Sequence, residues 1–239
     1  MKKITPELIN KATAILKKNK IKNYALLNLI ENNYISEIEI YKNCVAIKQN
    51  RSKGWIHLSC PNDENIETMS KLLKNERHFA ATETKFINIL SGGRKLLWHE
   101  DCNRLAYLKK EKFDIPLLPS LKSEHAKTVN EYWPYKSDYS LRYVKRRIKE
   151  GISSGKFIQN KLISWAITQD DSAMGFFHTL KEYRRNGFGE HVTKSLINKL
   201  IDKQIIPFVY IVLNNERSYS LTQKLGFELT GKVSWFEFE

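Results

Sequence analysis

Residues 174–189 read M-G-F-F-H-T-L-K-E-Y-R-R-N-G-F-G, and this stretch decides the fold that the sequence predicts. An apolar segment leads into a turn with two arginines and two glycines. The turn leads directly into a run in which apolar residues recur at regular intervals. From Phe188 to Leu200 apolar residues recur every four positions, which is typical of an amphipathic helix packed on a sheet. The pattern predicts a strand, a turn and a helix in direct succession.

The turn has the features of a phosphate site. Gly187 and Gly189 have no Cβ, so an anion can approach their backbone closely. The helix that follows adds its unpaired N–H groups and the positive end of its dipole, and Arg184 and Arg185 add charged donors. A turn that merely caps the helix is the alternative, because a glycine pair near arginines is a weak signal by itself. The dinucleotide fingerprint and the Walker loop are both excluded by missing residues.

Two motifs in this half of the chain resemble those of a known superfamily. The run Arg184-x-x-Gly187-x-Gly189 resembles the acetyl-CoA pyrophosphate loop of the GNAT superfamily of N-acyltransferases. Downstream, Asn215-x-x-Ser218 followed by K-L-G-F at 224–227 resembles its second signature. The phrasing S-W-A…D…G-F…T-L-x-E-Y-R-x-x-G, from residue 164 onward, is most similar to the glycine N-acyltransferase-like branch. The resemblance covers the C-terminal half, and the N-terminal half matches only faintly.

The resemblance implies a co-substrate, acetyl-CoA or another acyl-CoA, and the residues that hold it. The strand backbone at 177–179 would pair with the pantetheine arm as an added strand does, and residues 184–189 would hold the pyrophosphate. The full set of expected cofactor-binding residues is Phe177, His178, Thr179, Arg184, Arg185, Asn186, Gly187, Phe188, Gly189, Asn215 and Ser218.

The resemblance also implies an acid for the leaving thiolate and a base for the amine. Thr222 stands where many members have a tyrosine acid, so Ser218, one turn earlier on the same helix face, is the expected hydrogen-bond donor. Ala173 stands where many members have a glutamate base, which leaves Asp171, acting through water, and His178 as candidates. Asp171 shares the strand parity of Ala173, whereas His178 has the opposite parity. A packed or hydrogen-bonded histidine is the alternative for His178.

The expected activity is therefore direct transfer of an acetyl group from acetyl-CoA to a primary amine of a small molecule in a ternary complex. A non-catalytic acyl-CoA-binding or protein-interaction module is the alternative, because the customary acid and base are replaced. A protein amino terminus as acceptor and a homodimer remain open. The aromatic residues Trp133, Tyr135 and Tyr139 are expected either in an acceptor pocket or in the core.

Composition limits the other possible partners. The net charge of +14 comes from an excess of basic residues that is spread evenly along the chain. Residues 1–118 contain 21 Lys/Arg against 13 Asp/Glu, and residues 119–239 contain 19 against 13, so there is no basic tail. The densest basic cluster, at 145–149, alternates with apolar residues and predicts a solvated helix face, which disfavours a nucleic-acid partner. No apolar run approaches the ~20 residues that span a bilayer, and the N-terminus lacks a secretory pattern. Cytoplasm is the expected compartment.

Three distant cysteines and six scattered histidines predict neither a disulfide framework nor a zinc site, and no metal is expected. The fold class predicted is α+β. A smaller N-terminal α+β domain at 1–115, either independent or a degenerate GNAT-like half, precedes a GNAT-type domain at 116–239 with a mixed, mostly antiparallel central sheet flanked by helices. Residues 227–229 and 233–238 are expected to form a closing hairpin around Gly231.

Overall fold

The computed structural model describes residues 1–51 and 53–239 and divides the chain into two compact units. Unit 1 contains residues 1–104, 211–216 and 229–239, and unit 2 contains residues 105–210 and 217–228. Each unit is built on a mixed, mostly antiparallel sheet flanked by helices, so the predicted α+β class is confirmed. The units are not contiguous in sequence, because the C-terminal strand belongs to unit 1. The predicted boundary at 115/116, between an N-terminal α+β domain and a GNAT-type domain, stays a prediction.

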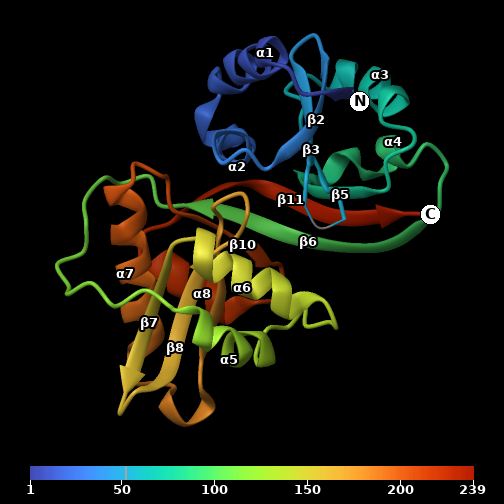
Figure 1. Ribbon diagram of the computed structural model, residues 1–239. Coiled ribbons are helices and arrows are strands. Elements are labelled where there is room, and N and C mark those ends of the chain that lie inside the picture. Colours follow the sequence, from blue (N-terminus) through green and yellow to red (C-terminus); the bar gives the residue numbers. More distant parts are fainter. Residues whose placement is uncertain (52) are drawn as a thin grey trace. The chain divides into compact units, whose positions relative to one another are not determined.

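Unit 1 has its strands in the order β1-β2-β3-β4-β5-β11-β6. From β1 to β11 in this order, the β4–β5 pair is parallel and the other pairs are antiparallel. In Figure 1, α1 and α2 lie on one side of β2 and β3, and α3 and α4 on the other. Its elements are β1 (Lys2–Lys3), α1 (Pro6–Lys17), α2 (Lys20–Glu31), β2 (Ile35–Tyr41), β3 (Cys44–Gln49), β4 (Ile56–Ser59), α3 (Ile66–Leu72), β5 (His78–Glu83), α4 (Ile87–Ser91), β6 (Leu96–Ala106) and β11 (Glu228–Phe238).

Two predictions for unit 1 are wrong. Cys44 and Cys60 form a disulfide, because Val45 pairs with Ser59 in the antiparallel β3–β4 ladder and this register places the two cysteines directly opposite each other. The expected closing hairpin does not form either. Gly231 continues an extended strand, β11, which pairs with β5.

Unit 2 has the strand order β10-β9-β8-β7, with α5 and α6 on one face of the sheet and α7 on the other (Figure 1). Trp165 of β8 packs with Val129 and Val144 of the first two helices, whereas Ser154 of β7 bonds Ser195 of α7. Its elements are α5 (Ala126–Glu131), α6 (Ser140–Glu150), β7 (Ser153–Ile158), β8 (Lys161–Thr168), β9 (Met174–Thr179), α7 (Phe188–Asp202), β10 (Phe208–Val212) and α8 (Glu216–Lys224).

The apolar stripe predicted for α7 is confirmed, since Val192, Leu196 and Leu200 are buried. Asn198 is buried as well, although its residue type suggests exposure. Its side chain donates to the carbonyl of Phe113 (2.8 Å) and accepts from the N–H of the same residue (2.9 Å). These bonds fasten the segment between β6 and α5 to the helix that follows the glycine turn.

Candidate active site

The glycine turn opens directly into α7 and leaves the helix N-terminus without a side-chain cap. Gly187 is the N-cap residue and has a left-handed backbone (φ +74°), which a residue with a Cβ adopts only with strain. A Cβ at Gly187 would meet no atom within 4 Å, so the space beside it is open. The N–H groups of the first helical turn have no intrahelical acceptor and face this space. The turn therefore suits an anion.

Side chains of the turn fix its shape. Arg184 donates from Nε to the carbonyl of Thr179 at the end of β9 (3.0 Å), and the side-chain amide of Asn186 donates to the carbonyls of Tyr183 and Arg184. Arg184 and Arg185 are both exposed. Their positive charges would attract an anionic ligand bound at the helix N-terminus.

One acidic residue, Glu190, lies in the first turn of α7. Its two oxygens pair with Lys194 (2.8 Å) and Lys224 of α8 (2.6 Å), and hydrogen bonds from these lysines hold the pKa of Glu190 below its ordinary value. The lysine charges offset the carboxylate beside the proposed anion site. The pair with Lys224 also ties the helix of the second motif to the start of α7, which sequence spacing alone did not show.

Strand β9 separates from β10 soon after it begins. The parallel pair has a single bridge, Val209 opposite Met174. Beyond it, residues 176–179 pair only with β8 within the described part of the chain. The other edge of this segment is open for an added strand, and the side chain of Phe177 is 41% exposed. This is the backbone that the sequence assigned to the pantetheine arm.

A β-bulge in β9 changes which side chains share a face. Ile167 pairs with Gly175 and Trp165 pairs with His178, so three residues of β9 oppose two of β8, and Phe176 has a positive φ of +53°. The parity argument that placed His178 on the opposite face from Ala173 is therefore wrong. The extra residue turns His178 to the sheet face covered by α5 and α6.

His178 lies between two aromatic rings. Its imidazole is 4.5 Å from the ring of Tyr132 and 5.0 Å from that of Trp165, measured between centroids. Its Nε2 is buried and has no hydrogen-bond partner among the described residues. Burial, and then the charge of Arg184, lower the pKa of His178 below its ordinary value of 6.5. The lowered pKa favours the neutral imidazole, which can accept a proton. Tyr132 is a site neighbour that sequence patterns missed.

Asp171 lies in the turn between β8 and β9 and is buried. Burial raises its pKa to about 6, although the N–H of Ala173 donates to its Oδ1 (3.0 Å) and this hydrogen bond lowers the pKa. The neighbouring Asp170 differs, because it pairs with Arg146 (2.9 Å) and Arg147 (3.0 Å) of α6. Asp170 thus holds the turn to the helix, while Asp171 has a raised pKa because it is buried.

Thr222 and Ser218 of α8 differ in whether their hydroxyl groups can donate a hydrogen bond to a leaving group. Thr222 is buried, and its hydroxyl is within hydrogen-bond distance of the Ser218 (3.2 Å) and Tyr219 (2.8 Å) carbonyls of its own helix. It cannot then serve as a donor to a leaving group. Ser218 is half-buried, and Asn215, just before the helix, is exposed.

The aromatic residues near α5 divide between core and surface. Trp133 contacts Tyr143 (5.5 Å) and Phe176 (5.0 Å), which makes it part of the packing beneath α6. Tyr135 and Tyr139 are 51% and 86% exposed. The alternative left open by the sequence is thus resolved for Trp133 in favour of packing. Among the described residues, no group of His, Cys, Asp or Glu side chains could hold a metal ion, and no helix is long and apolar enough to cross a membrane.

Residues 150–236 match the family described as FR47-like protein. The human protein glycine N-acyltransferase-like protein 2 is 28% identical over 111 residues, a stretch that makes up 46% of this chain and 38% of the human protein. The match thus spans less than half of that relative's length. The FR47-like match, at 150–236, includes the motifs on which the resemblance to the glycine N-acyltransferase-like branch depends.

Solved structures share the fold over nearly the whole chain. An X-ray structure of a Drosophila protein has a TM-score of 0.81 at 17% identity and covers 100% of this chain and 98% of its own. A GCN5-related N-acetyltransferase from Kribbella flavida has a TM-score of 0.60 at 12% identity, with 91% and 94% covered. The FR47-like match over residues 150–236, the human relative and the shared fold make this chain similar to GNAT acyltransferases.

Proposed function

We propose that this chain transfers the acetyl group of acetyl-CoA to a primary amine of a small molecule, by direct transfer while both substrates are bound. The observation that carries the proposal is the uncapped N-terminus of α7 behind a left-handed Gly187, with two exposed arginines beside it. Such a terminus stabilises a diphosphate through backbone N–H groups and the helix dipole. The open edge of β9 supports binding of the pantetheine arm next to it. Cytoplasmic localisation and a homodimer remain predictions.

In the proposed reaction, His178 or Asp171 takes a proton from the amine, and the amine then attacks the thioester. A backbone N–H of residues 177–179, on the open edge of β9, stabilises the oxyanion. Ser218 donates a hydrogen bond to the departing thiolate, which needs little help because a thiol has a pKa of about 8.5.

The pH dependence of kcat/KM, compared between variants of the two residues, distinguishes the two bases. If His178 is the base, activity falls as pH drops through a midpoint below 6.5, because burial lowers the pKa of this imidazole. If Asp171 is the base, the midpoint lies near 6, because burial raises the pKa of this carboxyl. We expect either His178→Asn or Asp171→Asn to abolish the fall of kcat/KM at low pH, which is the acid limb of the profile. An unchanged limb in both variants would exclude both residues as the base.

The leaving-group role of Ser218 predicts an asymmetry within α8. Ser218→Ala should lower kcat about tenfold, since a lost hydrogen bond to a charged group costs about 1.5 kcal/mol. Thr222→Val should leave kcat nearly unchanged, because the Thr222 hydroxyl is engaged by its own helix. Steady-state kinetics of both variants with a reactive amine check this. Equal effects of the two substitutions would contradict the assignment to Ser218.

The second candidate function is a non-catalytic acyl-CoA-binding or protein-interaction module. Two observations favour it. Ala173 stands where many members of the superfamily have a glutamate base. Thr222 stands where many have a tyrosine acid, and its hydroxyl bonds to carbonyls of its own helix. Release of free thiol from acetyl-CoA in the presence of a panel of amines separates the two functions. Tight binding of acetyl-CoA without turnover of any amine would favour the module.

We also propose that the N-terminal part is a degenerate GNAT-like half. The element order α1-α2-β2-β3-β4-α3-β5-α4-β6 recurs as α5-α6-β7-β8-β9-α7-β10-α8-β11, and β4–β5 is parallel as β9–β10 is. The connection from β4 to α3 differs chemically from the glycine turn. It begins with Cys60, fixed by the disulfide, and continues with Asp63 and Glu64. Two carboxylates would repel a diphosphate, so we expect a single acyl-CoA per chain, measurable as binding stoichiometry.

A further inference from the structure

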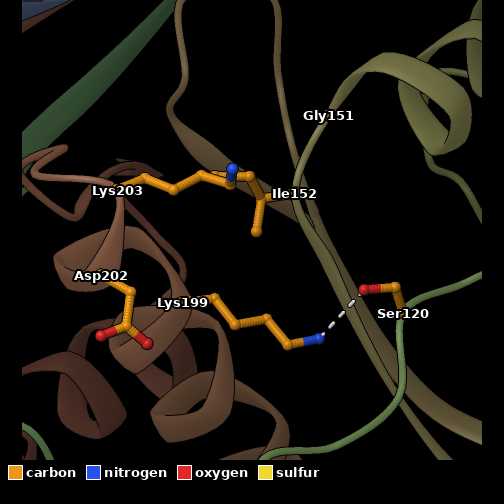
Figure 2. A pocket seen from close by; sticks show the side chains of 6 residues that line it. All are labelled: Ser120, Gly151, Ile152, Lys199, Asp202 and Lys203. Carbon is orange, nitrogen blue, oxygen red and sulfur yellow. Dashed lines mark hydrogen bonds between the residues drawn. The ribbon is translucent and has the colours of Figure 1, made fainter.

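A pocket of about 410 Å³ lies near the C-terminal end of α7, at the opposite end of this helix from the glycine turn. Figure 2 shows the Lys199 side chain extending from the helix towards Ser120. Its Nζ donates to the carbonyl of Ser153 (2.7 Å) and is 3.2 Å from the hydroxyl of Ser120. The residues that line the pocket are Ser120, Gly151, Ile152, Lys199, Asp202 and Lys203.

The amine of Lys199 has no carboxylate partner among the described residues. The carboxylate of Asp202, which lines the same pocket, pairs with Lys112 instead (2.6 Å). The other charged group of the lining is Lys203. Because no ion pair offsets the loss of hydration, burial lowers the pKa of Lys199 to about 8.

The two hydrogen bonds determine what a neutral Lys199 can do. A neutral amine has two N–H groups and one lone pair, and the Ser153 carbonyl and the Ser120 hydroxyl engage both N–H groups. The lone pair then remains for bond formation. At pH 7.5 roughly a quarter of a population with this pKa is neutral, whereas an ordinary lysine with a pKa of about 10.4 is neutral in about one molecule in a thousand.

We propose that Lys199 is a covalent modification site that takes acyl groups from small thioesters entering this pocket. The Nζ lone pair attacks the thioester carbonyl carbon, the new N–C bond forms, and the C–S bond breaks. The thiolate leaves and takes up the proton that the amine releases, so the products are an amide and a free thiol. The amide keeps one N–H, so acylation removes one of the two hydrogen bonds that Nζ makes.

The test uses the full chain and S-acetyl-N-acetylcysteamine, a thioester without the diphosphate of coenzyme A. The result therefore does not depend on the proposed function of the glycine turn. Peptide mass spectrometry measures the acetylation rate of Lys199 and of Lys203, an exposed lysine of the same pocket, between pH 6.5 and 10. We expect Lys199 to react at least ten times faster than Lys203 at pH 7.5, with a rate that levels off near pH 8.

Ser120→Ala provides a matched check on the geometry. Loss of this partner should change the rate at Lys199 while the rate at Lys203 stays constant, because the hydroxyl accepts from Lys199 and donates to the Ser153 carbonyl (3.4 Å). Equal rates at the two lysines in the unmodified chain would overturn the proposal. A Lys199 rate that keeps rising above pH 9, as expected of an ordinary lysine, would overturn it as well.

Discussion

Replacing Gly187 and Gly189 together with glutamate should weaken the binding of coenzyme A by at least a factor of about 100. A side chain at Gly187 would occupy the open space beside the turn, and a Cβ at Gly189 would approach the Thr179 hydroxyl to 3.3 Å. Two carboxylates would also repel a diphosphate at the helix N-terminus. Loss of two charge-assisted hydrogen bonds, each about 1.5–3 kcal/mol, accounts for the expected factor. Isothermal titration calorimetry measures it.

The chain contains a matched control for this double variant. Gly92 and Gly93 also lie in an exposed turn, both have positive φ, and a Cβ at either would meet no atom within 4 Å. Gly92→Glu with Gly93→Glu adds the same charge, and strains the backbone at two positive-φ residues instead of one, far away along the sequence. Its affinity for coenzyme A should equal that of the unmodified chain. Equal loss in the two variants would show that charge or strain, not the glycine turn, causes the effect.

Asp170→Ala should reduce the free energy of unfolding by about 3–5 kcal/mol. Asp170 bridges Arg146 and Arg147, and Arg147 is only 3% exposed. Removing the carboxylate leaves a buried guanidinium without its countercharge, although its Nε still donates to the Thr168 carbonyl (2.9 Å). Chemical denaturation followed by circular dichroism gives the free energy.

Asp202→Ala is the control for this stability effect. Asp202 also pairs with one basic residue, Lys112, but both side chains are about half exposed, 45% and 52%. Solvent screening limits such a pair to less than about 1 kcal/mol. If the two aspartate variants lose similar stability, the buried network between α6 and the β8–β9 turn contributes less than its geometry indicates.

The sequence predicted the elements around the glycine turn well because their signals are local. The four-residue apolar period from Phe188 to Leu200 and the alternation in β8 and β9 depend on neighbours in the chain. The α+β class and the resemblance to the GNAT superfamily followed from these elements. The roles of His178, Asp171 and Ser218 remain predictions, as do the individual cofactor contacts.

Other features could not be predicted because they depend on the register of distant strands. The disulfide of Cys44 and Cys60 follows from the β3–β4 pairing, which spacing along the chain does not fix. The bulge at Phe176 adds one residue to β9 and reverses the parity on which the interpretation of His178 depended. Gly231 resembled a turn residue, yet β11 runs through it from Glu228 to Phe238 and pairs with β5 from Val233 onward.

A crystal structure with bound acetyl-CoA tests the central claim most directly. The claim predicts diphosphate oxygens about 2.7–3.2 Å from backbone nitrogens at the start of α7, between Gly187 and Gly189, with the pantetheine arm along the open edge of β9. A structure in which the diphosphate binds elsewhere, while the glycine turn holds no ligand, would contradict it.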